Sequence, residues 1–369
     1  MIDAARYTSG RIALANLSAA IDSLELRRRA GATFEELQAL SKLLFARGDL
    51  LGRIADHDRA ELGGSEAIAL APDSAHGLCI RARLAGRFHR FQEAGVLLDQ
   101  ALAAGYSGHE VDAERAALLQ ATGRYREALA LRQRLAEDNP GIHTVAALAS
   151  LLAETGEWAG AEDRYEAALA ADDGVSPLPC GQLLFEWGVS AMRRGDLERA
   201  EEIFRELDAI LPAHVPGRGH RAEVALARGQ LDVAAALITP LLEISDDPEY
   251  RGVYAEILAA RGEREAAASE AEHAAAAYEL LLARRPEAYA DHAAAFFIGI
   301  GNRPQRAVDL ATANWKLRDT PRSRSLLARA ITCEQRECGH GRAPLYHIEG
   351  QGHPGRGSQR AADSTMGSR

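Results

Sequence analysis

The stretches GRYREA at 123–128 and GDLERA at 195–200 follow one pattern: glycine, then an aromatic residue or leucine two positions later, then alanine three positions after that. The pattern recurs along the chain at steps of 41, 34, 33, 39, 34, 33 and 40 residues. A repeat of about 34 residues holds two helices and the turn between them. We therefore predict stacked helix–turn–helix units, with turns at Gly48, near His89, at Gly123, Gly156, Gly195, Gly229 and Gly262, and near Asn302.

The composition of the chain favours the same architecture. It has 369 residues, of which 47% are apolar and only 5% aromatic. Alanine is abundant in the windows with helical periodicity, whereas strands are usually poor in alanine and rich in β-branched residues. The formal net charge of −10 argues against a nucleic-acid partner, since such proteins usually carry a clustered basic face. The sequence therefore predicts an all-α protein that does not bind nucleic acid.

The amino terminus and the apolar runs bear on location in the cell. Residues 1–20, MIDAARYTSGRIALANLSAA, lack the basic start and the uninterrupted apolar core of a secretory signal. Apolar runs such as AAAFFIGIG at 293–301 fall far short of the roughly 18 residues that a transmembrane helix needs. Four scattered cysteines do not make a disulfide scaffold in a chain of this length. We expect a cytoplasmic protein of bacterial type with no membrane span.

Two of the long steps have a helical explanation. In the first unit, both Ala60 and Ala67 could be the small packing residue of the second helix, which precedes the closing proline, here Pro72. The two alanines are seven residues apart. In the seventh unit, a similar excess separates Ala274 from the closing Pro286. A heptad is close to two helical turns, so this insertion lengthens a helix and keeps the same face inward. We predict lengthened second helices in units one and seven, and a loop at 172–181 before unit five.

Two of the units carry a full set of packing residues around their turns. Unit five supplies them as Leu184, Trp187, Gly188, Gly195, Leu197, Ala200, Phe204, Leu207 and Pro212. Unit four supplies them as Val145, Leu148, Ala149, Gly156, Trp158, Ala161, Tyr165 and Ala168.

Over residues 33–331 the sequence resembles the tetratricopeptide repeat (TPR) family. The resemblance implies a right-handed α–α superhelix of about eight repeats and a truncated ninth. A capping helix at 1–32 and a disordered tail at 332–369 would flank this solenoid.

The small residues of the pattern have a mechanical role. We expect Gly188 and Ala200 to lie where two helix backbones approach closely, with Trp187 and Phe204 filling the grooves around that contact. Each helix pair would bury its remaining apolar face against the next pair, so stability would be a sum over neighbours.

In the TPR family the first helices of successive repeats line a concave groove that binds extended or helical peptides. The resemblance therefore implies a protein or peptide partner and places a defined set of residues on that face. They are Arg83, Arg87, Gln120, Ser150, Glu154, Gln182, Phe185, Val189, Met192, Arg193, Glu223, Glu256, His292 and Phe296. The alternative interpretation is that these are ordinary solvated helix positions. The clamp that chaperone-tail binders use for a terminal carboxylate is not matched, because its asparagine positions read Arg83, Ala117, Ser150, Val189, Glu223 and Glu256.

The carboxyl-terminal segment offers the one metal-like set of residues. Cys333 and Cys338 have an admissible spacing for zinc, but His347 and His353 are too far apart for a finger pattern, which leaves His340 as a weak further candidate. From Thr332 onward the segment is rich in Gly, Arg and His and has few core-forming residues, which is typical of disorder. We predict no metal site and no cofactor.

Catalytic motifs are also missing from the sequence, since HExxH, GxSxG and GxxxxGK[ST] do not occur. The leading hypothesis is a non-enzymatic TPR scaffold or adaptor that holds its partner in the concave groove. One alternative is a metal-binding or enzymatic accessory protein that uses the terminal Cys/His segment. Another is a homo-oligomer formed through the solenoid ends, where Leu326, Leu327 and Ile331 lack an evident cap.

Overall fold

The computed structural model describes residues 3–72 and 74–336, and every regular element in these two ranges is helical. A 3₁₀ turn, η1 (Ala4–Arg6), precedes α1 (Gly10–Gly31), and the helix pairs follow. The all-α prediction is confirmed. The pairs are α2 (Phe34–Leu51) with α3 (Ile54–Leu70), α4 (Ala75–Arg87) with α5 (Phe91–Ala103), α6 (His109–Ala121) with α7 (Tyr125–Asp138), and α8 (Ile142–Glu154) with α9 (Trp158–Ala170).

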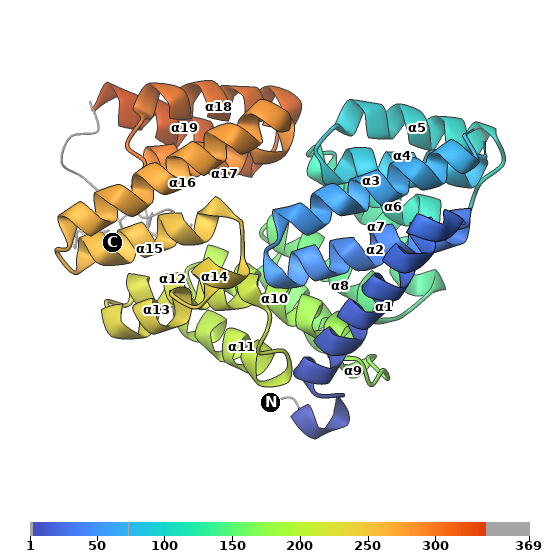
Figure 1. Ribbon diagram of the computed structural model, residues 1–369, viewed down its shortest axis with the longest axis horizontal. Helices are drawn as coiled ribbons and strands as arrows, with labels where there is room; N and C mark the ends of the chain where they lie inside the picture. Colours follow the sequence, from blue (N-terminus) through green and yellow to red (C-terminus); the bar gives the residue numbers. More distant parts are fainter. Residues whose placement is uncertain (1–2, 73, 337–369) are drawn as a thin grey trace, which may run out of the picture.

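The second half of the solenoid continues in the same way, and Figure 1 shows the helices winding into one superhelical turn. Its elements are α10 (Pro177–Arg193) with α11 (Leu197–Ile210), α12 (Val215–Ala227) with α13 (Leu231–Ile238) and α14 (Leu241–Ile244), α15 (Pro248–Ala260) with α16 (Arg264–Arg284), α17 (Pro286–Ile298) with α18 (Pro304–Leu317), and finally α19 (Pro321–Gln335). α19 extends past the predicted solenoid boundary at residue 331. None of the described helices is long and apolar enough to cross a membrane.

Local signals explain where many helices begin. Thr33 and Glu36 form a reciprocal capping box at the start of α2, in which the hydroxyl of Thr33 accepts from the Glu36 amide. Proline holds the first position of α10, α15, α17, α18 and α19, where its missing N–H has no intrahelical partner to lose. Pro240 interrupts the second helix of unit six, which is why α13 and α14 are separate.

Seven of the eight predicted turns lie at residues with left-handed backbone geometry, and their φ angles run from 45° at Asn302 to 85° at Gly156, Gly195 and Gly262. The prediction at Gly48 is wrong. α2 continues to Leu51, and the turn falls at Gly52, where φ is 59°. Gly48 is small for a different reason, since a Cβ there would lie 2.4 Å from Cδ2 of His57 on the facing helix.

The two predicted long helices have different outcomes. α16 has 21 residues where its partner α15 has 13, so the lengthened second helix of unit seven is confirmed. In unit one the extra residues are divided, since α2 has 18 and α3 has 17. The prediction placed all of them in the second helix because it put the turn too early.

α1 does more than cover the first repeat. Figure 1 shows it running obliquely from the region of α9 to α2. Ile21 is buried in the core it shares with Leu40 of α2. At its other end, the hydroxyl of Tyr7 donates to Asp172 at 2.8 Å, and the amide of Thr8 donates to the carbonyl of Val175. α1 therefore joins the first repeat to the loop between units four and five.

The superhelix closes on itself after one turn. In Figure 1 the repeats from α2 to α8 and those from α15 to α19 form two arms joined by α10 to α14. The carboxylate of Asp246 accepts from the amides of Ile54 and Ala55 at 2.6 and 3.0 Å, and so caps the start of α3. Arg285 pairs with both Asp58 and Glu61 of α3.

Further contacts extend this closure along the chain. The guanidinium of Arg285 lies 4.0 Å from the ring centroid of Phe88, and Nδ1 of His89 lies 3.1 Å from the carbonyl oxygen of Glu287. The turn at Gly123 lies against the backbone of Asp319, where a Cβ would approach the carbonyl oxygen to 2.5 Å. These contacts bring the two arms together around the concave face, and the space between the arms is called the lumen below.

Candidate functional site

The lumen contains two adjoining cavities of about 830 and 520 Å³. The larger cavity is bounded by helices from α6 to α10 on one side and by α15 to α19 on the other. The smaller cavity lies nearer the turns after α2 and α4 and the start of α15. Residues of α8, α10, α15, α17 and α19 line both, namely Ser150, Gln182, Glu186, Arg193, Glu249, His292 and Arg322. The two cavities therefore share a wall and adjoin each other.

Most residues that the family resemblance placed on the groove lie around this space. Those lining the larger cavity are Gln120, Ser150, Glu154, Gln182, Arg193, His292 and Phe296. The smaller cavity adds Arg87, Phe185, Val189, Met192 and Glu223. Arg83 and Glu256 line neither cavity.

Arg83 has a structural contact instead. Its guanidinium pairs with Glu110 at 2.6 Å and Glu114 at 2.5 Å, so it ties α4 to α6. Met192 and Phe296 are almost completely buried, with 4% and 1% of their surface exposed, so they pack in the wall and offer little surface to a ligand.

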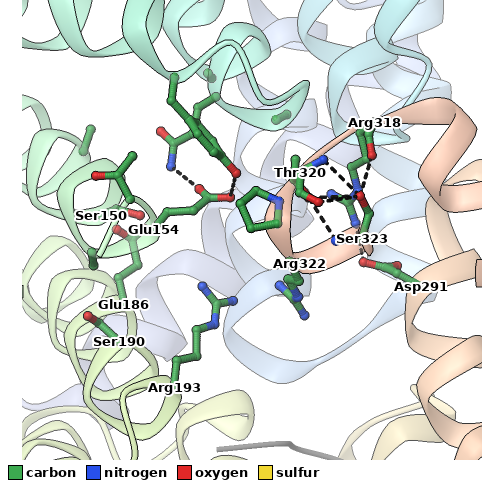
Figure 2. A pocket seen from close by; sticks show the side chains of 18 of the residues that line it. Ser150, Glu154, Glu186, Ser190, Arg193, Asp291, Arg318, Thr320, Arg322 and Ser323 are labelled. Atoms are coloured by element: carbon green, nitrogen blue, oxygen red, sulfur yellow. Dashed lines mark hydrogen bonds and ion pairs between the residues drawn. The ribbon is translucent and has the colours of Figure 1, made fainter. Parts of the chain in front are cut away.

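The larger cavity holds arginines that the sequence analysis did not select. Nε of Arg132 and Nη2 of Arg329 are buried, and neither atom has a hydrogen-bond partner within the described part of the chain. Burial lowers the pKa of both guanidinium groups. Figure 2 shows the guanidinium of Arg322 entering the same space from α19, with that of Arg193 entering from α10. An anion in this cavity would offset the cost of burying these cations.

The nearby carboxylates are already committed to partners. Glu154 accepts from the amide of Gln120 and the hydroxyl of Tyr125, both at 2.9 Å. Asp291 pairs with Arg318 (Figure 2). Burial alone would raise the pKa of Asp291, but the positive charges of neighbouring groups outweigh it and hold that pKa well below its usual value. Glu186 also lines the larger cavity, and its carboxylate interacts with Arg132 and Arg193 and offsets part of their charge. The five arginines of the lining outnumber its four carboxylates, so a surplus of positive charge remains.

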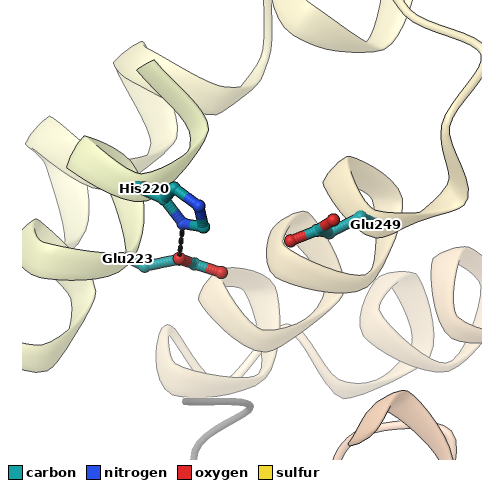
Figure 3. A group of neighbouring side chains, drawn as sticks. All are labelled: His220, Glu223 and Glu249. Atoms are coloured by element: carbon teal, nitrogen blue, oxygen red, sulfur yellow. Dashed lines mark hydrogen bonds and ion pairs between the residues drawn. The ribbon is translucent and has the colours of Figure 1, made fainter. Parts of the chain in front are cut away.

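A second polar group lies where the cavities meet. Nδ1 of His220 is 2.6 Å from Oε2 of Glu223, both on α12, and Nδ1 of His292 on α17 is 3.3 Å from Oε2 of Glu249 on α15. Burial raises the pKa of Glu223 to about 7. The desolvation of His292 is outweighed by Asp291 and Glu249, which raise its pKa to about 9. Figure 3 shows Glu249 facing the His220–Glu223 pair across the gap between their helices.

Some signals for the missed residues were present in the sequence. Arg132 stands where the family pattern has an aromatic residue, and that departure marks it. Arg322 and Arg329 belong to the first helix of the ninth unit, which lines the concave side as the earlier first helices do. His220 precedes Glu223 by one helical turn, but its proximity to Glu249 depends on the packing of α12 against α15.

Among the carboxyl-terminal metal candidates, Cys333 belongs to the described residues. Cys338, His340, His347 and His353 lie outside the described residues. Sγ of Cys333 is 3.7 Å from the carbonyl oxygen of Ile298.

The apolar residues proposed for self-assembly belong to α19. Leu326 is buried in the core of the last repeats, Leu327 packs against it, and Ile331 is 38% exposed. Self-assembly through this end stays a prediction.

Comparison with known proteins supports the fold. A family model described as tetratricopeptide repeat matches residues 191–257. No curated protein matches the sequence. Among solved structures, the chain is similar to the APC/C hetero-tetramer Cut9–Hcn1, with a TM-score of 0.51 and 13% identity over 80% of this chain and 55% of that one.

Two further solved structures are similar at lower TM-scores. A tetratricopeptide repeat protein from Parabacteroides merdae has a TM-score of 0.43 and 21% identity, over 65% of this chain and 91% of that one. PilW, a widely conserved type IV pilus biogenesis factor, has a TM-score of 0.45 and 18% identity, over 54% of this chain and 91% of that one.

Proposed function

Because the chain is a tetratricopeptide repeat protein, we propose that it is a non-enzymatic binding protein that holds a short, carboxylate-bearing segment of a protein partner inside its lumen. One observation carries the proposal. Nε of Arg132 and Nη2 of Arg329 are buried in the lining of the larger cavity and have no hydrogen-bond partner among the described residues, and Arg322 belongs to the same lining. Guanidinium groups bind carboxylates through paired, charge-assisted hydrogen bonds, and such bonds are strongest where water is scarce.

The size of the space limits what the partner can present. A volume of about 830 Å³ lies within the range of roughly 300–1,000 Å³ that is typical of ligand-binding clefts and cavities. The contacts between the two arms border this space on opposite sides and so restrict the room for a long docked helix. A chain terminus or a short extended segment therefore fits better than a folded surface or a long amphipathic helix.

The remaining lining suits a peptide backbone. Ser150 and Gln182 line both cavities and carry groups that can donate and accept hydrogen bonds. Phe185 and Val189 offer half-buried apolar surface in the smaller cavity. An extended peptide with its carboxylate at Arg329 could place its next residues along these side chains.

The test uses a synthetic library of short fluorescent peptides, each made with a free carboxyl terminus and as the terminal amide. We expect purified full-length protein to retain peptides with a free terminus or acidic side chains. The Arg329→Gln and Arg322→Gln variants should each weaken binding of a selected peptide by about tenfold, which corresponds to about 1.4 kcal/mol.

Arg324→Gln is the matched control. Arg324 lies on the same helix, is exposed, and pairs with Asp319 outside the cavity. Equal affinity of the wild type and the Arg329 and Arg322 variants for the selected peptides would refute the proposed site, as would a failure of the whole library to bind.

A further inference from the structure

Three potential metal ligands converge where the two cavities join. His220 and Glu223 are one turn apart on α12, and Glu249 lies in the first turn of α15. One imidazole nitrogen and one oxygen from each carboxylate lie within 4.8 Å of one another. Figure 3 shows the three side chains gathered around one small space.

Glu223 gives an independent indication that something binds there. Its side chain is only 9% exposed, and Oε2 is taken up by the contact with His220. Oε1 is buried and has no hydrogen-bond partner among the described residues. In Figure 3 this second oxygen is directed away from His220, toward the side on which Glu249 lies. A buried carboxylate oxygen without a partner is costly, and a bound cation would remove that cost.

From this geometry we infer that His220, Glu223 and Glu249 bind a divalent transition-metal ion. One imidazole and two carboxylates are a donor set that zinc and its neighbours in the first transition row accept. Calcium prefers a larger set of oxygen ligands, and magnesium retains its waters and rarely takes imidazole. Zinc is therefore the probe that this donor set favours.

The surroundings hold the three ligands in place. A Cβ on Gly219 would lie 2.6 Å from Cε1 of Tyr250, so this glycine lets α12 and α15 approach closely enough for their side chains to meet. The imidazole of His220 stacks on Phe185 with ring centroids 5.6 Å apart. Nδ1 of His292 lies 3.3 Å from Oε2 of Glu249. Partners of this kind orient metal ligands and strengthen binding.

The position of the ion would be accessible. Glu249 lines both cavities, and Glu223 lines the smaller one. Three protein ligands leave at least one coordination position for water or another donor. The inference does not rest on peptide binding, because the ion can be measured in the absence of any peptide.

The experiment titrates zinc chloride into chelator-treated, full-length protein by isothermal calorimetry. We expect one site, and we expect Glu223→Gln and Glu249→Gln each to weaken it by at least about tenfold. Both substitutions keep the shape of the side chain and remove its charge. Glu256→Gln, two turns further along α15 and outside the cluster, is the matched control and should bind zinc as the wild type does.

The terminal cysteines need their own control because they could bind zinc independently. The Cys333→Ser/Cys338→Ser double variant should keep the calorimetric site. Cobalt bound to the wild-type protein should lack the thiolate-to-metal absorption that cysteine ligands produce. Absence of zinc binding, binding that both Glu variants retain, or binding lost only in the cysteine variant would each overturn the inference. Thermal stabilisation of the wild type by zinc provides a check that needs no variant.

Discussion

His214 makes the stability of the solenoid depend on pH in a way that can be calculated. It is the N-cap of α12, where its Nδ1 accepts a hydrogen bond from the Gly217 amide at 3.0 Å. The side chain is 5% exposed, and burial lowers its pKa to about 3. The neutral imidazole is therefore the form that the folded protein holds.

The sign of the effect follows from the two pKa values of His214. In the unfolded chain its pKa is ordinary, at about 6.5, so below that pH the unfolded state takes up a proton that the folded state refuses. The stability due to neutral His214 is complete above about pH 6.5 and is lost progressively as the pH falls toward 3. A pH of about 5 lies about 1.5 units below the unfolded pKa of His214. At that pH the free energy of unfolding is therefore about 2 kcal/mol lower than above about pH 6.5.

The assay compares the wild type with His214→Asn. Asparagine is a good N-cap and does not titrate near these pH values, so it isolates the protonation of His214 from the loss of the cap. Urea unfolding followed by circular dichroism, at about pH 7.5 and about pH 5, should show the wild type losing about 2 kcal/mol more than the variant. His57 and His89, whose pKa values burial also lowers, contribute equally to both proteins. An identical pH dependence of the two proteins would refute the reasoning.

Three further predictions concern packing and closure. Ala161→Leu and Ala200→Leu place extra volume at fully buried helix contacts and should each cost about 1–3 kcal/mol in thermal unfolding; no loss in either would contradict the repeat register. Asp246→Asn weakens the cap on α3 and should speed amide exchange in the first turn of that helix by about fivefold, which corresponds to about 1 kcal/mol in the free energy of local opening. Amide exchange in α8 should be unchanged. Asp56→Ala leaves the buried guanidinium of Arg47 without its two hydrogen bonds to Asp56 and should lower the free energy of unfolding by about 3–5 kcal/mol in chemical denaturation. An unchanged denaturation midpoint would mean that the pair is not buried in solution.

Contacts between neighbouring helices could be predicted from the sequence because the repeat pattern encodes them. A Cβ on Gly188 would lie 2.5 Å from Cε1 of Phe204, so the glycine and the aromatic ring are one packing unit, as their spacing indicated. Gly48 shows the limit of this reasoning. Glycine serves both left-handed turns and close helix contacts, and only the position of His57 on the facing helix distinguishes the two uses.

The closure of the superhelix could not be predicted in the same way. Asp246 and the amide of Ile54 are separated by 192 residues. Whether two ends of a solenoid meet depends on small rotations added at every repeat, and each rotation depends on packing details that the consensus pattern does not specify. The family resemblance accordingly gave the residues of a concave face but not the contacts between the two arms.

The closure and the proposed metal site are joined by one short segment. The hydroxyl of Ser245 donates to the carbonyl of Gly52, Asp246 caps α3, and Asp247 accepts from the amide of Glu249 at 2.9 Å. These three consecutive residues therefore attach the start of α15 to the first repeat and fix the backbone that carries Glu249. A solenoid that did not close would leave this segment without its contacts to α2 and α3, and Glu249 would lose the support that directs it toward Glu223. The chemistry of the lumen thus depends on the long-range contact that the repeat pattern does not encode.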